Sequence, residues 1–428
     1  MTPAMPLARA GTEDGRRWWV LATVALALLL SMTTWFSATA VVPQLKVQWA
    51  LSDTLSAWLT IAVQVGFVIG AVGMSAMALS DIIPARRLIV LGAVGAAAAN
   101  AGILLTDQPG VVLGLRLATG ICLAGVYPPA LKLVATWFAR GRGLALGVLV
   151  GALTVGSAAP HLANALGGLR WQVVIASTTL TTLCGALVVA AAVHEGPYRF
   201  PRARFAPTQI GRVFRNRGVV LASLGYCGHM WELYAMWAWF LHFSRQALAD
   251  RHITGEAAAP LLTFAVIAAG AFGCVLGGIL GDRWGRPQVA GLMMAISGSC
   301  ALLAGVVYGG PLWLFVAVSL VWGITVVADS AQFSAMVTDL GDPQYVGTAL
   351  TLQLGLGFCL TAATIWILPV LAGVLQSWQW AFLILVPGPV LGILAMLGLQ
   401  HPHHRLARGS SQTAATKPRQ GAGALARF

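Results

Sequence analysis

Gly278-Ile-Leu-Gly-Asp-Arg-Trp-Gly-Arg-Pro287 is a short charged loop that separates two long apolar runs. The run before it covers about residues 259 to 280, and the run after it covers about residues 288 to 307. A helix of about 20 residues is long enough to cross the hydrocarbon core of a bilayer, which is about 30 Å thick. The alternation of apolar run and charged turn recurs along the chain, so the sequence predicts a protein that crosses a membrane many times.

The composition points the same way. Of the 428 residues, 58% are hydrophobic and only 9% are charged, whereas about 25% of the residues of a soluble domain are charged. So few charges cannot cover a surface that faces water. The sequence therefore predicts an all-α integral membrane protein.

Twelve apolar runs long enough to span a membrane fall into two groups of six. The first six cover about residues 18–40, 55–78, 88–106, 110–137, 143–166 and 172–193, and the second six cover about 217–243, 259–280, 288–307, 311–337, 347–370 and 378–399. The predicted domains are a cytoplasmic tail (1–17), a six-helix bundle (18–193), a basic central loop (194–216), a second six-helix bundle (217–399) and a disordered cytoplasmic tail (400–428).

The net charge of +13 reflects topology rather than binding to nucleic acid. Most Lys and Arg residues lie between the apolar runs, and six arginines crowd into residues 199–217 without the soluble fold that nucleic-acid recognition needs. Positive charge predominates on the face that also carries both termini. By the positive-inside rule, we expect both termini in the cytoplasm and the protein in the inner membrane of a bacterial-type cell.

The charged loop after residue 278 resembles the loop signature GxLxDRxGRR of the major facilitator superfamily, through Asp282, Arg283, Gly285 and Arg286. The matching loop of the first half, about 200 residues earlier, keeps an acid at Asp81 and arginines that begin at Arg86. The resemblance implies two pseudo-symmetric bundles that rock about a central cavity, which is lined by spans 1, 2, 4, 5, 7, 8, 10 and 11. We expect the acid and the arginines to make contacts across a cytoplasmic gate and then release them. The alternative is that they only set topology.

Ionisable groups inside a span cost about 2.5 to 3.5 kcal/mol each, so each needs a partner, water or a function. The candidates are Arg116 in the fourth span, Glu232 in the seventh and Asp329 in the tenth. Arg116 also begins an Arg-x-x-x-Gly pattern similar to the superfamily's fourth helix, and all three helices would surround the cavity. We therefore expect these groups to face one another and to bind substrate and protons.

Glu232 lies near the middle of its span, in company with Tyr226 and His229. A carboxyl group removed from water holds a proton more readily than a solvated one, and His229 is placed one helical turn away to relay that proton or to bind substrate. The alternative is that Glu232 and His229 pair with each other for packing alone.

Asp329 and Gln332 are about one helical turn apart, so both can face the same side. Asp329 is the second candidate proton carrier. The alternative is a salt bridge from Asp329 to Arg116 that holds two helices together, and for Arg116 itself the alternative is that it reaches out to the membrane surface.

These features predict a secondary active transporter of a small solute that works by alternating access and uses the proton gradient, with no cofactor and no metal. Arg116 favours a small anion as the substrate. The alternatives are a proton-driven exporter of drugs or metabolites, which the glycines of the fifth span resemble in part, and a non-transporting membrane protein or membrane enzyme. The sequence has no catalytic cluster and no P-loop, so we expect no enzyme activity. We expect a monomer whose partners are the solute and the lipid bilayer.

Overall fold

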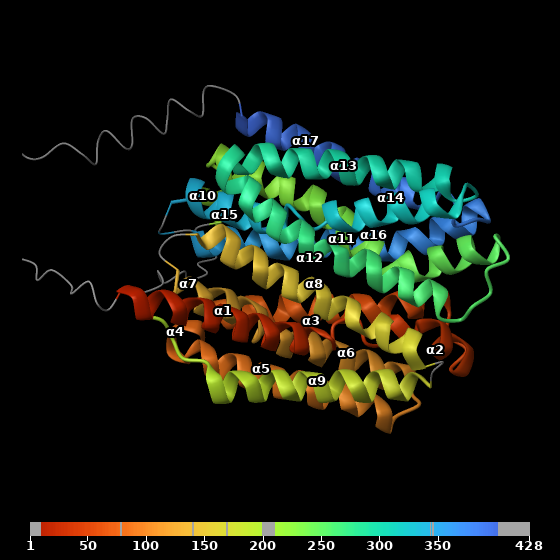
Figure 1. The fold of residues 1–428 in the computed structure, drawn as a ribbon, viewed down its shortest axis with the longest axis horizontal. Coiled ribbons are helices and arrows are strands. Elements are labelled where there is room, and N and C mark those ends of the chain that lie inside the picture. The colour runs from red at the N-terminus through yellow and green to blue at the C-terminus, as the bar shows by residue number, and fades with distance from the viewer. Residues whose placement is uncertain are drawn as a thin grey trace, which may run out of the picture.

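The computed structural model describes residues 10–77, 79–138, 141–167, 170–198, 210–342, 344 and 346–400. In Figure 1 the long helices run side by side along the molecule, and the helices at the two ends of the chain, α1 and α17, both have their outer ends on the left. We call that side the terminus-bearing end and the other side the opposite end.

The first half of the chain forms one bundle, which lies in the lower part of Figure 1. Its spans are α1 (Ala10–Met32), α3 (Asp53–Ala76), α5 (Ala85–Gly102), α6 (Pro109–Ala124) continued by α7 (Tyr127–Ala135), α8 (Arg142–Gly167) and α9 (Trp171–Ala192). The short elements are η2 (Thr39–Val41), α2 (Val42–Gln48), α4 (Leu79–Ile82) and η3 (Ile103–Leu105).

The second half forms the other bundle, in the upper part of the same view. Its spans are α11 (Arg217–Ala249), α12 (Ala258–Trp284), α13 (Arg286–Val307), α14 (Leu312–Thr325) continued by α15 (Ser330–Leu340), α16 (Val346–Leu375) and α17 (Pro387–Gln400). The short elements are α10 (Ile210–Val213) and η5 (Ala381–Leu385).

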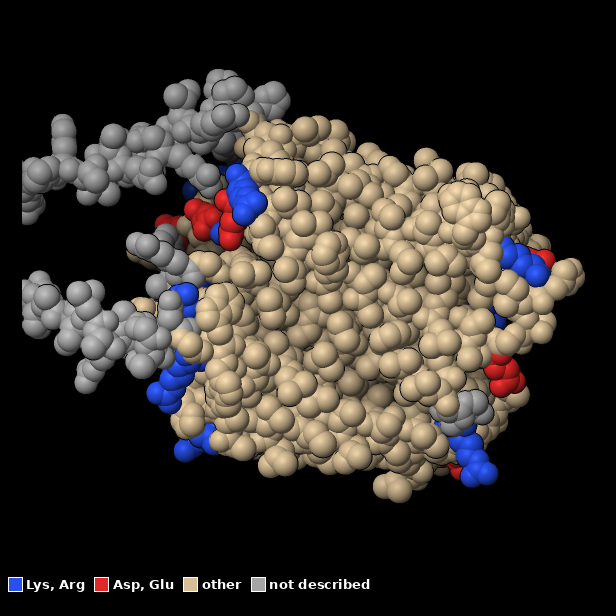
Figure 2. All heavy atoms as spheres, viewed as in Figure 1, with Lys and Arg blue, Asp and Glu red and all other residues tan. Residues whose placement is uncertain are grey.

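Eleven of the described segments are long and apolar enough to cross a membrane. The remaining predicted span is the seventh, α11, which has 33 residues but whose apolar run is interrupted by polar side chains. Figure 2 shows charged side chains at the two ends of the molecule and an uncharged surface between them, as a bilayer requires. The protein is therefore an all-α, multi-pass membrane protein with two six-helix bundles.

Three predicted spans are interrupted. In the first, α1 ends at Met32; the fourth bends at Gly125 and Val126 before Pro128 enters the first turn of α7; and in the tenth a turn from Val326 to Asp329 separates α14 from α15. The missing N–H group and fixed φ of proline suit a helix start, which explains the second break. These breaks free backbone groups that side chains then bind.

The described bounds differ from the predicted domains at the chain ends. Helix α1 begins at Ala10, inside the predicted tail 1–17. Residues 1–9 and 401–428, which hold most of the two predicted tails, lie outside the described residues, as do residues 199–209 of the central loop.

The two bundles meet along a seam in which α8 packs against α12 and α3 packs against α16. The α8–α12 contact is close because glycines line it: a Cβ atom on Gly147 would lie 2.8 Å from the carbonyl oxygen of Cys274, and one on Gly278 would lie 2.9 Å from that of Gly143. Small residues let two helix backbones approach each other in a membrane. The seam therefore joins the bundles backbone to backbone at the terminus-bearing end.

Candidate functional site

The turn between α14 and α15, in the tenth span, places the carboxylate of Asp329 beside His229. Asp329 ends the break, and its Oδ1 atom lies 2.8 Å from Nδ1 of His229 on α11, with both side chains 2% exposed. The approach is close but the angle is poor, so this oxygen makes no hydrogen bond of good geometry. The other ring nitrogen of His229 lies 2.7 Å from the hydroxyl of Ser330, the first residue of α15. The break thus surrounds His229 with a carboxylate and a hydroxyl.

Glu232 lies one turn further along α11 but does not pair with His229. Its Oε1 atom accepts a 2.7 Å hydrogen bond from Nε1 of Trp322, and its Oε2 atom accepts a 2.9 Å hydrogen bond from the hydroxyl of Ser297. Glu232 is 1% exposed. Its carboxyl group is therefore held inside the second bundle, between α13 and α14, by two neutral donors.

The other two predicted residues of this group point to different neighbours. Gln332 donates a 3.0 Å hydrogen bond to the carbonyl oxygen of Gly277 on α12, so it diverges from Asp329 although one turn separates them. The ring of Tyr226 lies 6.1 Å from the rings of both His229 and Phe333. Tyr226 is half-buried and faces the same region as His229.

Arg116 belongs to the first bundle and not to this cluster. It is fully buried, and its guanidinium donates to the carbonyl oxygens of Leu59 (3.0 Å), Thr34 (2.8 Å) and Trp35, and to the hydroxyl of Ser37 (3.1 Å). Two of these carbonyls, those of Thr34 and Trp35, lie in the turns that follow the end of α1 at Met32. The structure thus does not bring Arg116 to Asp329 or Glu232, and Arg116 holds the break of the first span in place.

An aromatic layer fills the middle of the seam. It consists of Trp35, Phe36 and Phe67 from the first bundle and Tyr234, Trp237 and Phe358 from the second. Trp35 stacks on Tyr234 with ring centroids 5.9 Å apart, and the edge of Trp237 meets Phe36 at the same distance. The layer closes the path between the bundles with side chains from both.

Buried polar atoms without partners accompany the aromatic layer. The indole N–H groups of Trp35 and Trp237 make no hydrogen bond, nor does either polar atom of the Gln64 side chain, and these residues are at most 3% exposed. Gln64 lies on α3 three residues before Phe67, so the two share a helix face. Because buried polar groups in proteins are nearly always paired, these unpaired donors are candidate groups for binding a polar ligand.

The predicted gate loop crosses the seam through Asp282. A Cβ atom on Gly143 would lie 2.6 Å from Oδ1 of Asp282, so the carboxylate of α12 sits against the first turn of α8 in the other bundle. The N-terminus of a helix carries partial positive charge, which favours a carboxylate there. Gly285, at the turn into α13, has a φ of 97°, a conformation that glycine adopts readily and other residues rarely do.

The arginines of the predicted gate that have a described contact make it within their own bundle. Nη1 of Arg286 lies 3.6 Å from Oδ2 of Asp339, in the same bundle, and Arg283 is exposed. Arg86 donates to the carbonyl oxygen of Ala190 on α9. The side chain of Asp81 lies outside the described residues.

Two side-chain contacts connect α8, through Cys274 of α12, to the turn between α14 and α15. The hydroxyl of Thr154 on α8 lies 3.9 Å from the thiol of Cys274 on α12, and that thiol donates to the carbonyl oxygen of Val327 at 3.7 Å. Val327 is two residues before Asp329. A shift of α8 against α12 would therefore reach the break that holds Asp329.

Sequence reasoning missed several members of these clusters, namely Ser297, Trp322, Ser330, Gln64 and Trp35. Serine and tryptophan are common in spans, and no sequence signal shows which helix face meets another helix. The unwound Val326–Asp329 segment contains no proline or glycine to mark it. Within the described residues, no group of three or more His, Cys, Asp or Glu is placed to hold a metal ion.

Comparison with known families gives a match along most of the chain. The model of the Major Facilitator Superfamily matches residues 24–249 and again residues 238–426. Monocarboxylate transporter 11 of Homo sapiens is 29% identical over 336 residues, which cover 72% of this chain and 68% of that protein. The puromycin resistance protein pur8 of Streptomyces alboniger is 29% identical over 163 residues, which cover 37% of this chain and 32% of that protein.

Among solved structures, the fold resembles that of a bacterial homologue of the human lysosomal transporter Spinster in an inward-facing, unoccupied conformation. The TM-score is 0.65, the identity is 16%, and the match covers 89% of this chain and 97% of the other. At this identity the likeness concerns the fold alone.

Proposed function

Because this chain belongs to the major facilitator superfamily, whose model matches both halves, we propose that it is a proton-coupled transporter of a small anion of the carboxylate class. Its energy source is the proton gradient, it needs no cofactor, and it works as a monomer. The basic residues of the terminus-bearing end favour the cytoplasm for both termini and the inner membrane as the location.

The observation that carries proton coupling is the contact of His229 with Asp329 at the break of the tenth span. The two groups are buried and 2.8 Å apart, so a proton bound between them stabilises the pair and its loss changes the charge of the break. Glu232 offers a second buried carboxyl group with neutral donors only. A charge that is costly in a membrane is a functional candidate by default.

Alternating access follows from the seam. In the state described, Asp282 sits against the first turn of α8, and the aromatic layer closes the middle. When the bundles rock, the terminus-bearing end opens by moving α8 away from α12. That movement pulls on the Thr154–Cys274–Val327 contacts and so alters the surroundings of Asp329. Protonation of the pair and opening of the seam are thereby linked.

The substrate class rests on the donors of the aromatic layer. A carboxylate accepts hydrogen bonds from the unpaired N–H groups of Trp35, Trp237 and Gln64, while the rings hold an apolar remainder. Arg116 plays no part in this binding, because its donors are engaged by the first bundle. The monocarboxylate transporter among the relatives agrees with this class.

The experiment is uptake into proteoliposomes of a panel of labelled carboxylates (acetate, lactate and benzoate), with and without an imposed pH gradient. We expect at least one to accumulate only with the gradient, and Asp329→Asn to abolish that accumulation. Glu256→Gln, in an exposed loop, is the matched control. Accumulation that ignores the gradient would refute proton coupling.

Export of an amphiphilic solute is the second candidate. The aromatic layer carries no formal charge and would suit such a compound, and the puromycin resistance protein among the relatives favours it. Gradient-driven efflux of ethidium or puromycin from proteoliposomes, with no carboxylate transport, would select this function over the first.

A further inference from the structure

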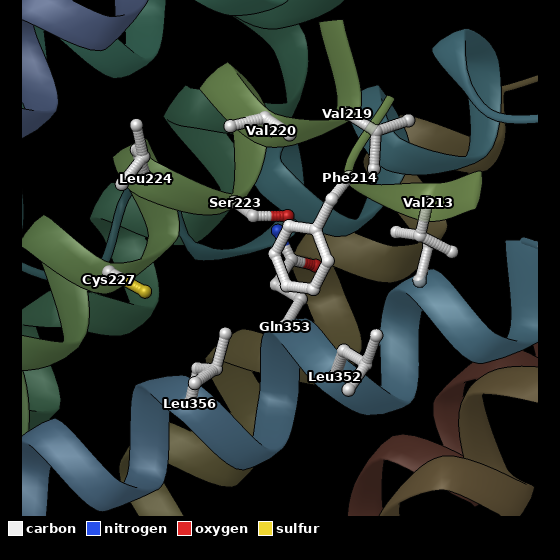
Figure 3. A pocket seen from close by; sticks show the side chains of 11 residues that line it. Val213, Phe214, Val219, Val220, Ser223, Leu224, Cys227, Leu352, Gln353 and Leu356 are labelled. Carbon is white, nitrogen blue, oxygen red and sulfur yellow. The ribbon is translucent and has the colours of Figure 1, made fainter. Parts of the chain in front are cut away.

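A groove lies between α11 and α16 of the second bundle, and its lining does not include the buried carboxyl groups. It is bounded by α10, the first turns of α11 and the first half of α16. In Figure 3 the side chains of Phe214, Ser223 and Gln353 meet in its middle, with Leu224 and Leu356 towards one end.

The groove is apolar and reaches the lipid-facing surface. Phe214, Leu224 and Leu356 line it and are 56%, 51% and 46% exposed. Helix α11 begins at Arg217 at the terminus-bearing end, and Cys227 lines the far part of the groove. At 1.5 Å per residue, the stretch of α11 from Arg217 to Cys227 is about 15 Å long, which matches one leaflet of a hydrocarbon core about 30 Å thick.

One polar group in the groove lacks a partner. Gln353 is 2% exposed, and its Nε2 atom makes no hydrogen bond. In a membrane no water reaches such a donor, so an unpaired amide is costly unless a ligand supplies an acceptor. An ester carbonyl or a phosphate oxygen is such an acceptor.

Two arginines follow Phe214, which lines the groove. Arg215 and Arg217 flank the corner between α10 and α11 and are exposed. Asn216 fixes this corner, because its Oδ1 atom accepts from the backbone N–H of Val219 at 3.1 Å and its Nδ2 atom donates to the carbonyl oxygen of Leu340 at 2.8 Å. The rim therefore holds positive charge at the depth of lipid headgroups.

We infer that this groove binds one anionic phospholipid. An acyl chain fills the apolar channel, a carbonyl or phosphate oxygen accepts from Nε2 of Gln353, and the headgroup lies at Arg215 and Arg217. A transmembrane helix, with a diameter of about 10 Å, presents no acceptor that could reach a recessed amide, since its carbonyls bond within the helix.

The test is native mass spectrometry of the purified full chain titrated with phosphatidylglycerol and, separately, phosphatidylcholine. We expect one phosphatidylglycerol molecule to bind saturably and phosphatidylcholine to bind more weakly. Val220→Trp, which fills the groove, and the pair Arg215→Gln with Arg217→Gln should each weaken phosphatidylglycerol binding at least about fivefold, roughly 1 kcal/mol. Gln353→Leu should weaken binding of both lipids.

The matched control is Leu394→Trp, on the exposed face of α17 outside the groove. It should bind phosphatidylglycerol as the wild type does, and the thermal unfolding midpoints should show that all variants are folded. Equal binding by Val220→Trp and Leu394→Trp would overturn the assignment. Equal affinity for the two lipids would also overturn it. A dimer that Val220→Trp alone disrupts would show instead that the groove holds a second copy of this chain.

Discussion

Nδ1 of His229 lies 2.8 Å from Oδ1 of Asp329, and the two side chains belong to different helices of the second bundle. Asp329 is the last residue of the turn that joins α14 to α15 within the tenth span. Ionisable groups buried within a membrane span are costly and are functional candidates. We propose that proton coupling in this protein depends on that pair.

Asp329→Asn is expected to abolish gradient-driven accumulation but to retain exchange of labelled for unlabelled solute. The amide keeps the size of the side chain and cannot take up or release a proton, whereas exchange at equal concentrations requires no net proton movement. Both rates are measured in the same proteoliposomes, with Glu256→Gln as the control. Loss of exchange together with accumulation, in a folded protein, would instead make Asp329 a substrate-binding residue.

Trp322→Phe is expected to destabilise the second bundle by about 1 to 3 kcal/mol, because it leaves Oε1 of Glu232 buried without its donor. Thermal unfolding in detergent measures the loss. Trp313→Phe, at a residue of the same helix that is 71% exposed, should change the midpoint little. A Trp322→Phe protein as stable as the wild type would show that the hydrogen bond contributes nothing.

Arg116→Lys is expected to lower the yield of folded protein and its unfolding midpoint, by about 3 kcal/mol or more in stability. Lysine cannot donate at once to the carbonyls of Leu59, Thr34 and Trp35, and hydrogen bonds to charged groups contribute about 1.5 to 3 kcal/mol each. Size-exclusion profiles and thermal unfolding measure it, with exposed Arg170→Lys as the control. Normal stability with a raised KM would restore Arg116 as an anion-binding residue.

Gly143→Ala is expected to loosen the seam at the terminus-bearing end, because its Cβ atom would collide with the carboxylate of Asp282. A cysteine introduced at Ser75, near Thr351 across the seam, should then react faster with a membrane-impermeant thiol reagent. Gly355→Ala, where a Cβ atom meets nothing within 4 Å, is the control. An unchanged reaction rate would mean that the Asp282 contact does not hold the seam closed.

The large-scale architecture could be predicted from the sequence because apolar length and charge placement alone dictate it. Twelve runs, two halves and the loop around Asp282 needed no knowledge of which face each helix buries. Predicting the site would have required knowing which face each helix buries. Arg116 was expected beside the acidic groups, but a buried guanidinium also satisfies carbonyls freed by a helix break, and the break after Met32 has no proline or glycine to reveal it.

The partners of the carboxyl groups were unpredictable for the same reason. Glu232 and His229 are one turn apart, yet Glu232 turns to Ser297 and Trp322 while His229 turns to the tenth span. Only the packing of α13 and α14 against α11 decides between these directions. The side chain of Gln332 likewise donates its hydrogen bond to Gly277 on α12 rather than to the carboxylate of Asp329, because α15 begins at Ser330, after the turn.

Proton flux during transport is the decisive measurement for proton coupling. Proteoliposomes that contain a pH-sensitive dye are given the transported carboxylate without an imposed gradient, and the internal pH is recorded for the wild type and Asp329→Asn. The account predicts that solute entry in the wild type is accompanied by a change in internal pH that a protonophore removes, and that Asp329→Asn shows none while still exchanging solute. Wild-type solute entry without any protein-dependent pH change, or an Asp329→Asn protein with the wild-type pH change, would contradict it.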